Sequence, residues 1–166
     1  MASTLRFVAI FLLVLVSAFF SATEIAFSSV NALRLKNLKK EKETISRLLA
    51  VKILDDYDNL LSSILIGNNI ANMASSSIAT VVIIGWWGES YAWASTVIMT
   101  LLVLTFGEII PKVLAKQFPE LFCCFASIPM YALSVIFKPI NFVIMGFVNL
   151  VSRIWQNSAD DSEAVS

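Results

Sequence analysis

The chain has 166 residues, of which 58% are hydrophobic and 14% are charged, with a mean hydropathy of +0.80 and no net charge. Soluble domains carry about 25% charged residues, so this composition excludes an ordinary soluble enzyme and indicates one integral membrane domain. The absence of histidine excludes a histidine-bound zinc site and a Ser-His-Asp triad, and the adjacent Cys123 and Cys124 give no disulfide framework.

The first apolar run covers residues 7–33. Arg6 before the run and the small pair Ser21-Ala22 within it resemble a signal peptide with its cleavage site. The apolar character continues beyond that pair through Phe27, however, so we predict a complete membrane span.

The next segment, residues 34–58, is strongly charged, and its apolar residues recur at spacings near three and four. This pattern predicts one or two amphipathic helices on the membrane surface or in water. The basic residues of the segment are Arg34, Lys36, Lys39, Lys40, Lys42, Arg47 and Lys52.

Two further apolar runs, residues 59–84 and 92–114, predict a second and a third span joined by a short loop at 85–91. The loop has paired tryptophans, which are typical of a membrane interface, and contains neither lysine nor arginine. Because basic segments stay in the cytoplasm, we expect residues 34–58 inside and both the loop and the N-terminus outside. The chain is therefore expected to be a multi-pass protein of the plasma (inner) membrane.

Residues 121–152 are also apolar but contain Pro129, Lys138 and Pro139. Each half of this region is shorter than the roughly 20 residues of a span, so we predict two short interfacial helices that form a belt around the bundle. The C-terminus would then be cytoplasmic, whereas a fourth span, the alternative, would place it outside. The polar residues 156–166 are interpreted as a linker toward cytosolic domains absent from this chain.

Polar side chains interrupt the first predicted span on one helix face, which carries Ser17, Ser21 and Glu24. Close helix packing explains small and hydroxyl residues on such a face. Packing does not need a carboxylate, so the serines and Glu24 together favour a polar site, although the role of Glu24 itself stays open.

In the second predicted span, Asn68 and Asn72 are one turn apart and follow Gly67. Buried amides are costly without partners, and hydrogen bonds between helices are one explanation for them. We favour ligand binding by both asparagines, because Gly67 beside them can leave a carbonyl free or open the helix.

In the third predicted span, Glu108 precedes Pro111 and lies one turn before Lys112. An ionisable side chain at membrane depth costs about 2.5–3.5 kcal/mol on insertion scales, so Glu108 requires a partner, a cavity or an ion. A helix pair between Glu108 and Lys112 is one alternative. Pro111 removes a backbone donor, which frees carbonyl oxygens close to the carboxylate.

Hydroxyl, amide, carbonyl and carboxylate oxygens from three spans are hard ligands, which suit magnesium, calcium or sodium better than zinc or copper. Discontinuous helices hold ions near mid-membrane in secondary transporters. The sequence has no phosphate-binding loop of the Walker type, so we do not expect ATP hydrolysis within this chain.

Residues 20–26 (FSATEIA), 67–72 (GNNIAN) and 107–112 (GEIIPK) resemble the transmembrane domain of the CorC/cyclin-M (CNNM) magnesium transporters. The resemblance covers residues 5–155, so we interpret residues 1–155 as one such domain. It implies an all-α homodimer in which each subunit has three spans and a juxtamembrane helical belt. It also implies magnesium export coupled to sodium entry, with ATP binding only in cytosolic domains absent here. The implied ion ligands are Ser17, Ser21, Gly67 through its carbonyl, Asn68, Asn72 and Glu108.

The expected function is therefore secondary transport of Mg²⁺, with Na⁺ as the coupling ion, by alternating access around this site. We expect no enzymatic activity and no nucleic-acid partner. The alternative is a membrane scaffold or regulatory subunit in which the polar residues only pack helices together. A membrane-embedded hydrolase is disfavoured because no histidine or lysine base accompanies the serines.

Overall fold

The computed structural model describes residues 2–41 and 43–163, and all regular structure in these ranges is helical. This confirms that the chain is all-α, as predicted. The elements in chain order are α1 (Ala2–Ser29), α2 (Ala32–Glu41), α3 (Ile45–Asp55), α4 (Tyr57–Trp87), η1 (Glu89–Tyr91), α5 (Ala92–Leu102), η2 (Val103–Ile109), α6 (Ile110–Gln117) and α7 (Pro119–Glu163).

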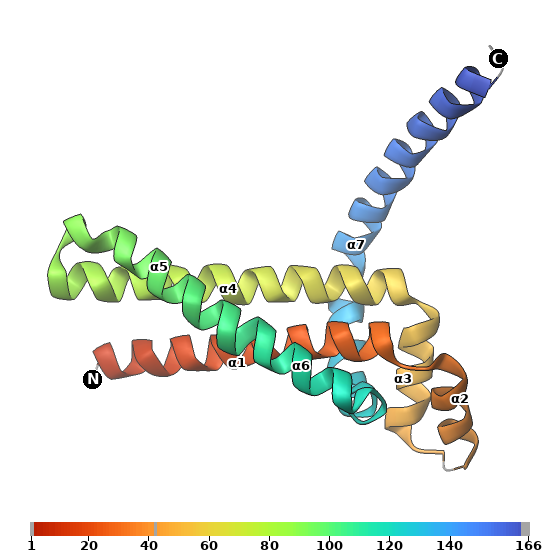
Figure 1. Cartoon of the computed structure of the whole chain (residues 1–166), viewed down its shortest axis with the longest axis horizontal. Helices are drawn as coiled ribbons and strands as arrows, with labels where there is room; N and C mark the ends of the chain where they lie inside the picture. The colour runs from red at the N-terminus through yellow and green to blue at the C-terminus, as the bar shows by residue number, and fades with distance from the viewer. Residues whose placement is uncertain (1, 42, 164–166) are drawn as a thin grey trace.

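Helices α1 and α4 lie side by side in opposite directions, and the segment α5–η2–α6 runs obliquely across them (Figure 1). Along this segment α5 packs on α4, whereas η2 and α6 pack on α1. The rings of Phe7 and Trp86 are 5.4 Å apart, so the start of α1 lies beside the end of α4. The N-terminus and the loop after α4 therefore share one end of the bundle.

Four helical segments within the described residues are long and apolar enough to cross a membrane. Three of them coincide with the predicted spans, although α1 ends at Ser29, before the predicted limit of residue 33. The fourth lies in α7, so length and composition alone do not establish the predicted count of three spans. The four segments are Thr4–Ser29, Tyr57–Trp87, Glu89–Gln117 and Pro119–Val148.

The charged segment after the first span forms the short helices α2 and α3 at the opposite end of the bundle (Figure 1). Leu35 and Ala50 of these helices are fully buried, while Lys36, Lys40 and Lys52 are exposed. The two helices are tied together by an ion pair of 3.0 Å between Lys36 and Asp55. Amphipathic periodicity therefore identified both helices correctly.

The prediction of two short helices between residues 121 and 152 is wrong, because α7 is one helix that continues through Pro129 and Pro139. Each proline removes one backbone hydrogen bond, but the first part of α7 packs against α1, α3 and α4 and keeps its helical course. Figure 1 shows α7 crossing the bundle at a steep angle and leaving it toward the C-terminus. The helix extends to Glu163, and the last residues, 164–166, lie outside the described part of the chain.

Close contact between α1 and α4 depends on Gly67, whose Cα faces the ring of Phe20. A Cβ added at Gly67 would lie 2.2 Å from Cζ of Phe20, and Phe20 is itself only 4% exposed. The ring therefore occupies the space that any larger residue at position 67 would need.

We predict that Gly67→Ala lowers the free energy of unfolding by about 1–3 kcal/mol, because the new methyl group overpacks the contact with Phe20. Gly85→Ala is the matched control, since nothing lies within 4 Å of an added Cβ at that position of the same helix. Thermal unfolding in detergent, followed by circular dichroism, measures both variants. Equal midpoints for the two variants would contradict the assigned contact.

Candidate metal site

A hydrogen bond joins the polar residues of the first and second spans in the middle of the bundle. The hydroxyl of Ser17 donates to Oδ1 of Asn68 over 2.8 Å, and Ser17 is fully buried. Two of the predicted ligands are therefore in direct contact, although they are far apart in the chain.

The third span approaches the same serine through Gly107. A Cβ added at Gly107 would lie 2.9 Å from Oγ of Ser17, so only glycine lets the backbone of η2 come this close. Ser17 is thus the point at which α1, α4 and η2 meet. From the sequence, Gly107 was identified as the neighbour of Glu108, but its close approach to Ser17 was not predicted. The sequence signal that could have indicated this approach is a glycine near a proline in an apolar helix.

The third span is distorted at this point, because residues Val103–Ile109 form the π-helix η2 between α5 and α6. The N–H of Ile110 donates to the carbonyl of Thr105, five residues earlier instead of four. Pro111 follows and has no N–H, so the carbonyl of Gly107 lacks the donor that an α-helix would supply. This carbonyl belongs to the residue that packs against Ser17.

Two predicted ligands have buried oxygen atoms without a hydrogen-bond partner in the described part of the chain. These atoms are Oγ of Ser21 and Oδ1 of Asn72. Because α1 and α4 are antiparallel, Ser21 and Asn72 lie one turn, about 6 Å, to opposite sides of the Ser17–Asn68 bond. Side chains on a helix lean toward its N-terminus, so both residues lean back toward the level of that bond.

Glu108 contributes the carboxylate of this region and is half-buried on η2. Among the described residues it has neither a hydrogen-bond partner nor an ion-pair partner. The alternative pair between Glu108 and Lys112 is not formed, since Nζ of Lys112 lies 3.0 Å from Oε2 of Glu24. The structure therefore assigns Glu24 to a contact between α1 and α6, which no sequence spacing indicated.

The predicted opening of the second span at Gly67 is not observed, because α4 is an uninterrupted α-helix from Tyr57 to Trp87. The interruption lies in the third span, at Gly107 and Pro111. A carbonyl oxygen has two lone pairs and can accept a helical hydrogen bond while binding a cation. Ligation by the carbonyl of Gly67 therefore stays a prediction.

A hydroxyl oxygen of α1 and an amide oxygen of α4 meet here beside the backbone of Gly107, and the carboxylate of Glu108 is on the next residue of η2. Cys123 and Cys124 lie on α7, away from η2, and the described residues contain no cluster of three or more His, Cys, Asp or Glu side chains. Neutral oxygens with a single carboxylate suit a hard cation that is bound and released, rather than a tightly held transition metal.

A family model described as the cyclin M transmembrane N-terminal domain matches residues 7–166. A UPF0053 protein of Haemophilus influenzae is 36% identical over 152 residues, which cover 92% of this chain and 36% of the relative. The UPF0053 inner membrane protein YfjD of Escherichia coli is 28% identical over 139 residues, covering 84% and 32%. A chloroplastic DUF21 domain-containing protein of Arabidopsis thaliana is 31% identical over 130 residues, covering 77% and 19%. The chain thus spans about a third or less of the length of these relatives.

We predict that the Glu24–Lys112 pair has a measurable coupling energy of about 0.5–1 kcal/mol, as partly exposed ion pairs do. A double-mutant cycle of Glu24→Gln and Lys112→Met, read from thermal unfolding, measures it. The matched cycle of Glu108→Gln and Lys112→Met should give no coupling beyond experimental error. A larger coupling in the second cycle would mean that Lys112 neutralises Glu108.

Proposed function

The chain belongs to the cyclin M transmembrane domain family, and from that premise we propose that it carries Mg²⁺ across the membrane as a secondary transporter. The finer part of the proposal is export of Mg²⁺ driven by entry of Na⁺. The binding site proposed for the ion consists of Ser17, Ser21, Gly67, Asn68, Asn72 and Glu108.

One observation carries the proposal: oxygen atoms are buried at the centre of an apolar bundle, and no group among the described residues forms a hydrogen bond with them. Oγ of Ser21 and Oδ1 of Asn72 have no hydrogen-bond partner in the part of the chain that the structure describes, and they flank the Ser17–Asn68 bond. An unsatisfied buried polar atom costs about 1–3 kcal/mol, so helix packing alone gives no reason to keep two of them. A cation bound at the level of the Ser17–Asn68 bond, toward which both side chains lean, would remove this cost.

The composition of the site favours a small divalent ion. Mg²⁺ requires octahedral coordination by oxygen at about 2.0–2.1 Å, and the six proposed ligands provide one oxygen each. Glu108 supplies one negative charge against two positive charges of the ion. Partial neutralisation of this kind keeps the binding weak enough for release, as transport requires.

We propose that the hydroxyl of Ser17 exchanges its partners during the cycle. Without the ion, Ser17 donates to Oδ1 of Asn68. When the ion binds, the Ser17 proton turns away, and both oxygens direct a lone pair at the cation. The hydrogen bond therefore holds the two side chains near their binding positions and lowers the ordering cost of ion entry.

The π-helix provides a place at which access to the site can change. A return of η2 to α-helical bonding would rotate the residues that follow it and move Glu108 relative to Ser17. Gly107 tolerates this motion against Ser17 because it has no side chain. We propose that alternating access uses this segment and that Na⁺ binding favours one of its two hydrogen-bonding patterns.

The proposal also includes assembly and orientation. We infer a homodimer in the plasma (inner) membrane, as the resemblance to the CNNM transporters implies. The exposed apolar side chains of α5 and η2, Trp93, Leu101 and Phe106 among them, would then face lipid or the second copy. The basic helices α2 and α3 would lie on the cytoplasmic side, with the N-terminus outside.

We predict that millimolar Mg²⁺ raises the unfolding midpoint of the purified chain and that Glu108→Gln removes this shift. The amide keeps the size of the side chain but loses the charge that attracts the ion. Glu24→Gln is the matched control, because it removes a carboxylate of the same bundle that is paired with Lys112. It should lower the midpoint without Mg²⁺ and keep the shift with it, and an unchanged shift in Glu108→Gln would refute the site.

We further predict that proteoliposomes containing the chain move Mg²⁺ when a Na⁺ gradient is imposed and stop when the gradient is dissipated. A Mg²⁺-sensitive dye inside the vesicles measures the flux, and Glu108→Gln vesicles give the background. Mg²⁺ flux that does not depend on Na⁺ would support Mg²⁺ transport but exclude its coupling to Na⁺ entry. Absence of flux under both conditions would favour the alternative function, a membrane scaffold.

A further inference from the structure

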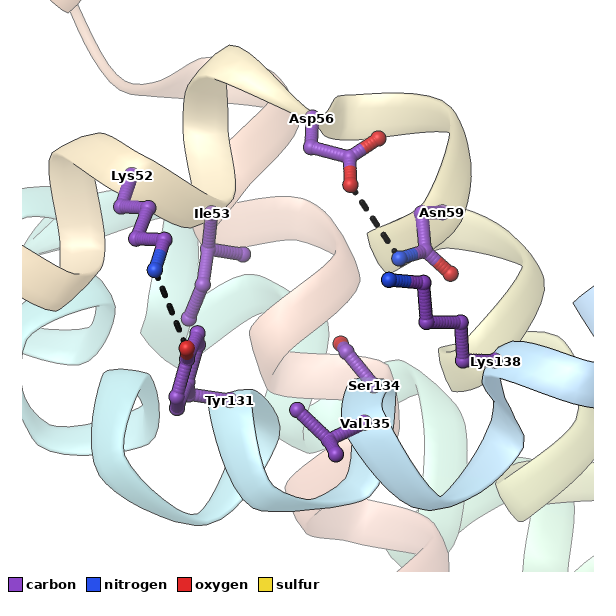
Figure 2. A pocket seen from close by; sticks show the side chains of 8 residues that line it. All are labelled: Lys52, Ile53, Asp56, Asn59, Tyr131, Ser134, Val135 and Lys138. Atoms are coloured by element: carbon purple, nitrogen blue, oxygen red, sulfur yellow. Dashed lines mark hydrogen bonds between the residues drawn. The ribbon is translucent and has the colours of Figure 1, made fainter.

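A second polar site lies outside the proposed ion site, where α7 crosses α3 and the start of α4. A cavity of about 240 Å³ opens here between the three helices (Figure 2). It is lined by Lys52, Ile53, Asp56, Asn59, Tyr131, Ser134, Val135 and Lys138. None of these residues takes part in the proposed transport of Mg²⁺.

Helix α7 presents one face to this cavity. Tyr131, Ser134 and Lys138 are spaced by three and four residues, so their side chains follow one another along the same side of the helix. From the opposite wall, Lys52 of α3 reaches the ring of Tyr131, and its Nζ lies 3.0 Å from the phenol oxygen (Figure 2).

The hydrogen-bonding groups of the cavity are mainly donors. Lys52 donates to the oxygen of Tyr131, so the proton of that hydroxyl is left to donate elsewhere. Ser134 is only 9% exposed, and its Oγ has no hydrogen-bond partner in the described part of the chain. Lys138 has neither a hydrogen-bond nor an ion-pair partner among the described residues. Two ammonium groups and two hydroxyls therefore line one cavity, and among the described residues Lys138 and the hydroxyl of Ser134 have no acceptor.

One carboxylate faces the same cavity, and its negative charge lowers the net charge of the cavity. Asp56 is exposed and accepts a hydrogen bond of 3.2 Å from Nδ2 of Asn59 (Figure 2). Two lysines against one aspartate leave the cavity with a net positive charge. The buried, unpartnered hydroxyl of Ser134 and this charge together indicate an anion with several acceptor oxygens.

We propose that this cavity binds the phosphate group of an anionic membrane phospholipid. Its position favours a lipid over a soluble phosphate compound, because apolar surface begins directly beside the donors. Val135 forms part of the cavity wall, and one turn beyond Lys138 the side chains of Phe142 and Val143 are 81% and 69% exposed. The acyl chains lie along this surface of α7 while the phosphate occupies the donors.

The test measures lipid binding to the 166-residue chain in neutral detergent micelles, by the shift of the unfolding midpoint during titration with phosphatidylglycerol. We expect a saturable rise for the unaltered chain and a much smaller one with phosphatidylcholine, whose choline neutralises the phosphate. Lys138→Gln should weaken the apparent affinity for phosphatidylglycerol about tenfold, as expected for loss of one charged hydrogen bond. Lys40→Gln on the exposed side of α2 is the control for net charge and should stay within about twofold of the unaltered chain.

Two more variants separate a built site from general attraction to negative charge. Ser134→Ala keeps every charge and should weaken binding about three- to tenfold, since it removes one buried donor. Lys138→Arg should retain most of the affinity, because it keeps the positive charge. An unfolding midpoint of Lys138→Gln without lipid close to that of the unaltered chain excludes a folding defect. Equal affinities for Lys138→Gln, Ser134→Ala and Lys40→Gln would overturn the proposal.

Inorganic phosphate distinguishes the two sources of the same ligand chemistry. We expect it to compete with phosphatidylglycerol only weakly, because it lacks the acyl chains that contact α7. If millimolar phosphate raises the unfolding midpoint as much as the lipid does, and this rise is lost in Lys138→Gln, the result would reject a lipid as the ligand of the cavity. Each of these results is independent of Mg²⁺ transport, because the cavity shares no residue with the proposed ion site.

Discussion

The hydrogen bond between Ser17 and Asn68 is the contact on which the centre of this bundle depends. In lipid, helices gain little from burying apolar surface against each other, because lipid tails are equally apolar. Close packing of small residues and hydrogen bonds between helices must hold the spans together instead. Gly67 under the ring of Phe20 and Gly107 against Ser17 supply the close packing, and the Ser17–Asn68 bond fixes the register of α1 and α4.

The polar centre and the distortion of the third span are parts of one arrangement. Pro111 cannot donate to the carbonyl of Gly107, and η2 adopts bonds that span five residues immediately before it. The ion pair between Glu24 and Lys112, the residue after Pro111, holds α6 against α1. Irregular backbone at membrane depth is thus enclosed by protein on the side of α1, as the absence of water in a bilayer requires.

Much of this architecture follows from the sequence, because apolar length predicts spans and amphipathic periodicity predicts surface helices. Ser17 and Asn68, which the sequence singled out on two different spans, also meet in the structure, while their binding of an ion stays a prediction. The π-helix was not predictable, since the same amino-acid sequence pattern is compatible with backbone hydrogen bonds to the fourth and to the fifth preceding residue. The continuity of α7 through Pro129 depends on contacts with other helices, and so does the choice of Glu24 as partner of Lys112. Local pattern contains none of that information.

The attachment of α7 to α4 has a mechanical consequence. Nδ2 of Asn141 donates to the backbone carbonyl and Oδ1 of Asn59 and, over 2.9 Å, to Oγ of Ser63, so this point of α7 follows the first turns of α4. From Asn141 to Glu163 the helix extends about 33 Å at 1.5 Å per residue. A tilt of about 10° at the attachment would displace the far end by roughly 6 Å over that length. The helix therefore acts as a lever arm that amplifies small rotations inside the membrane into displacements at its tip.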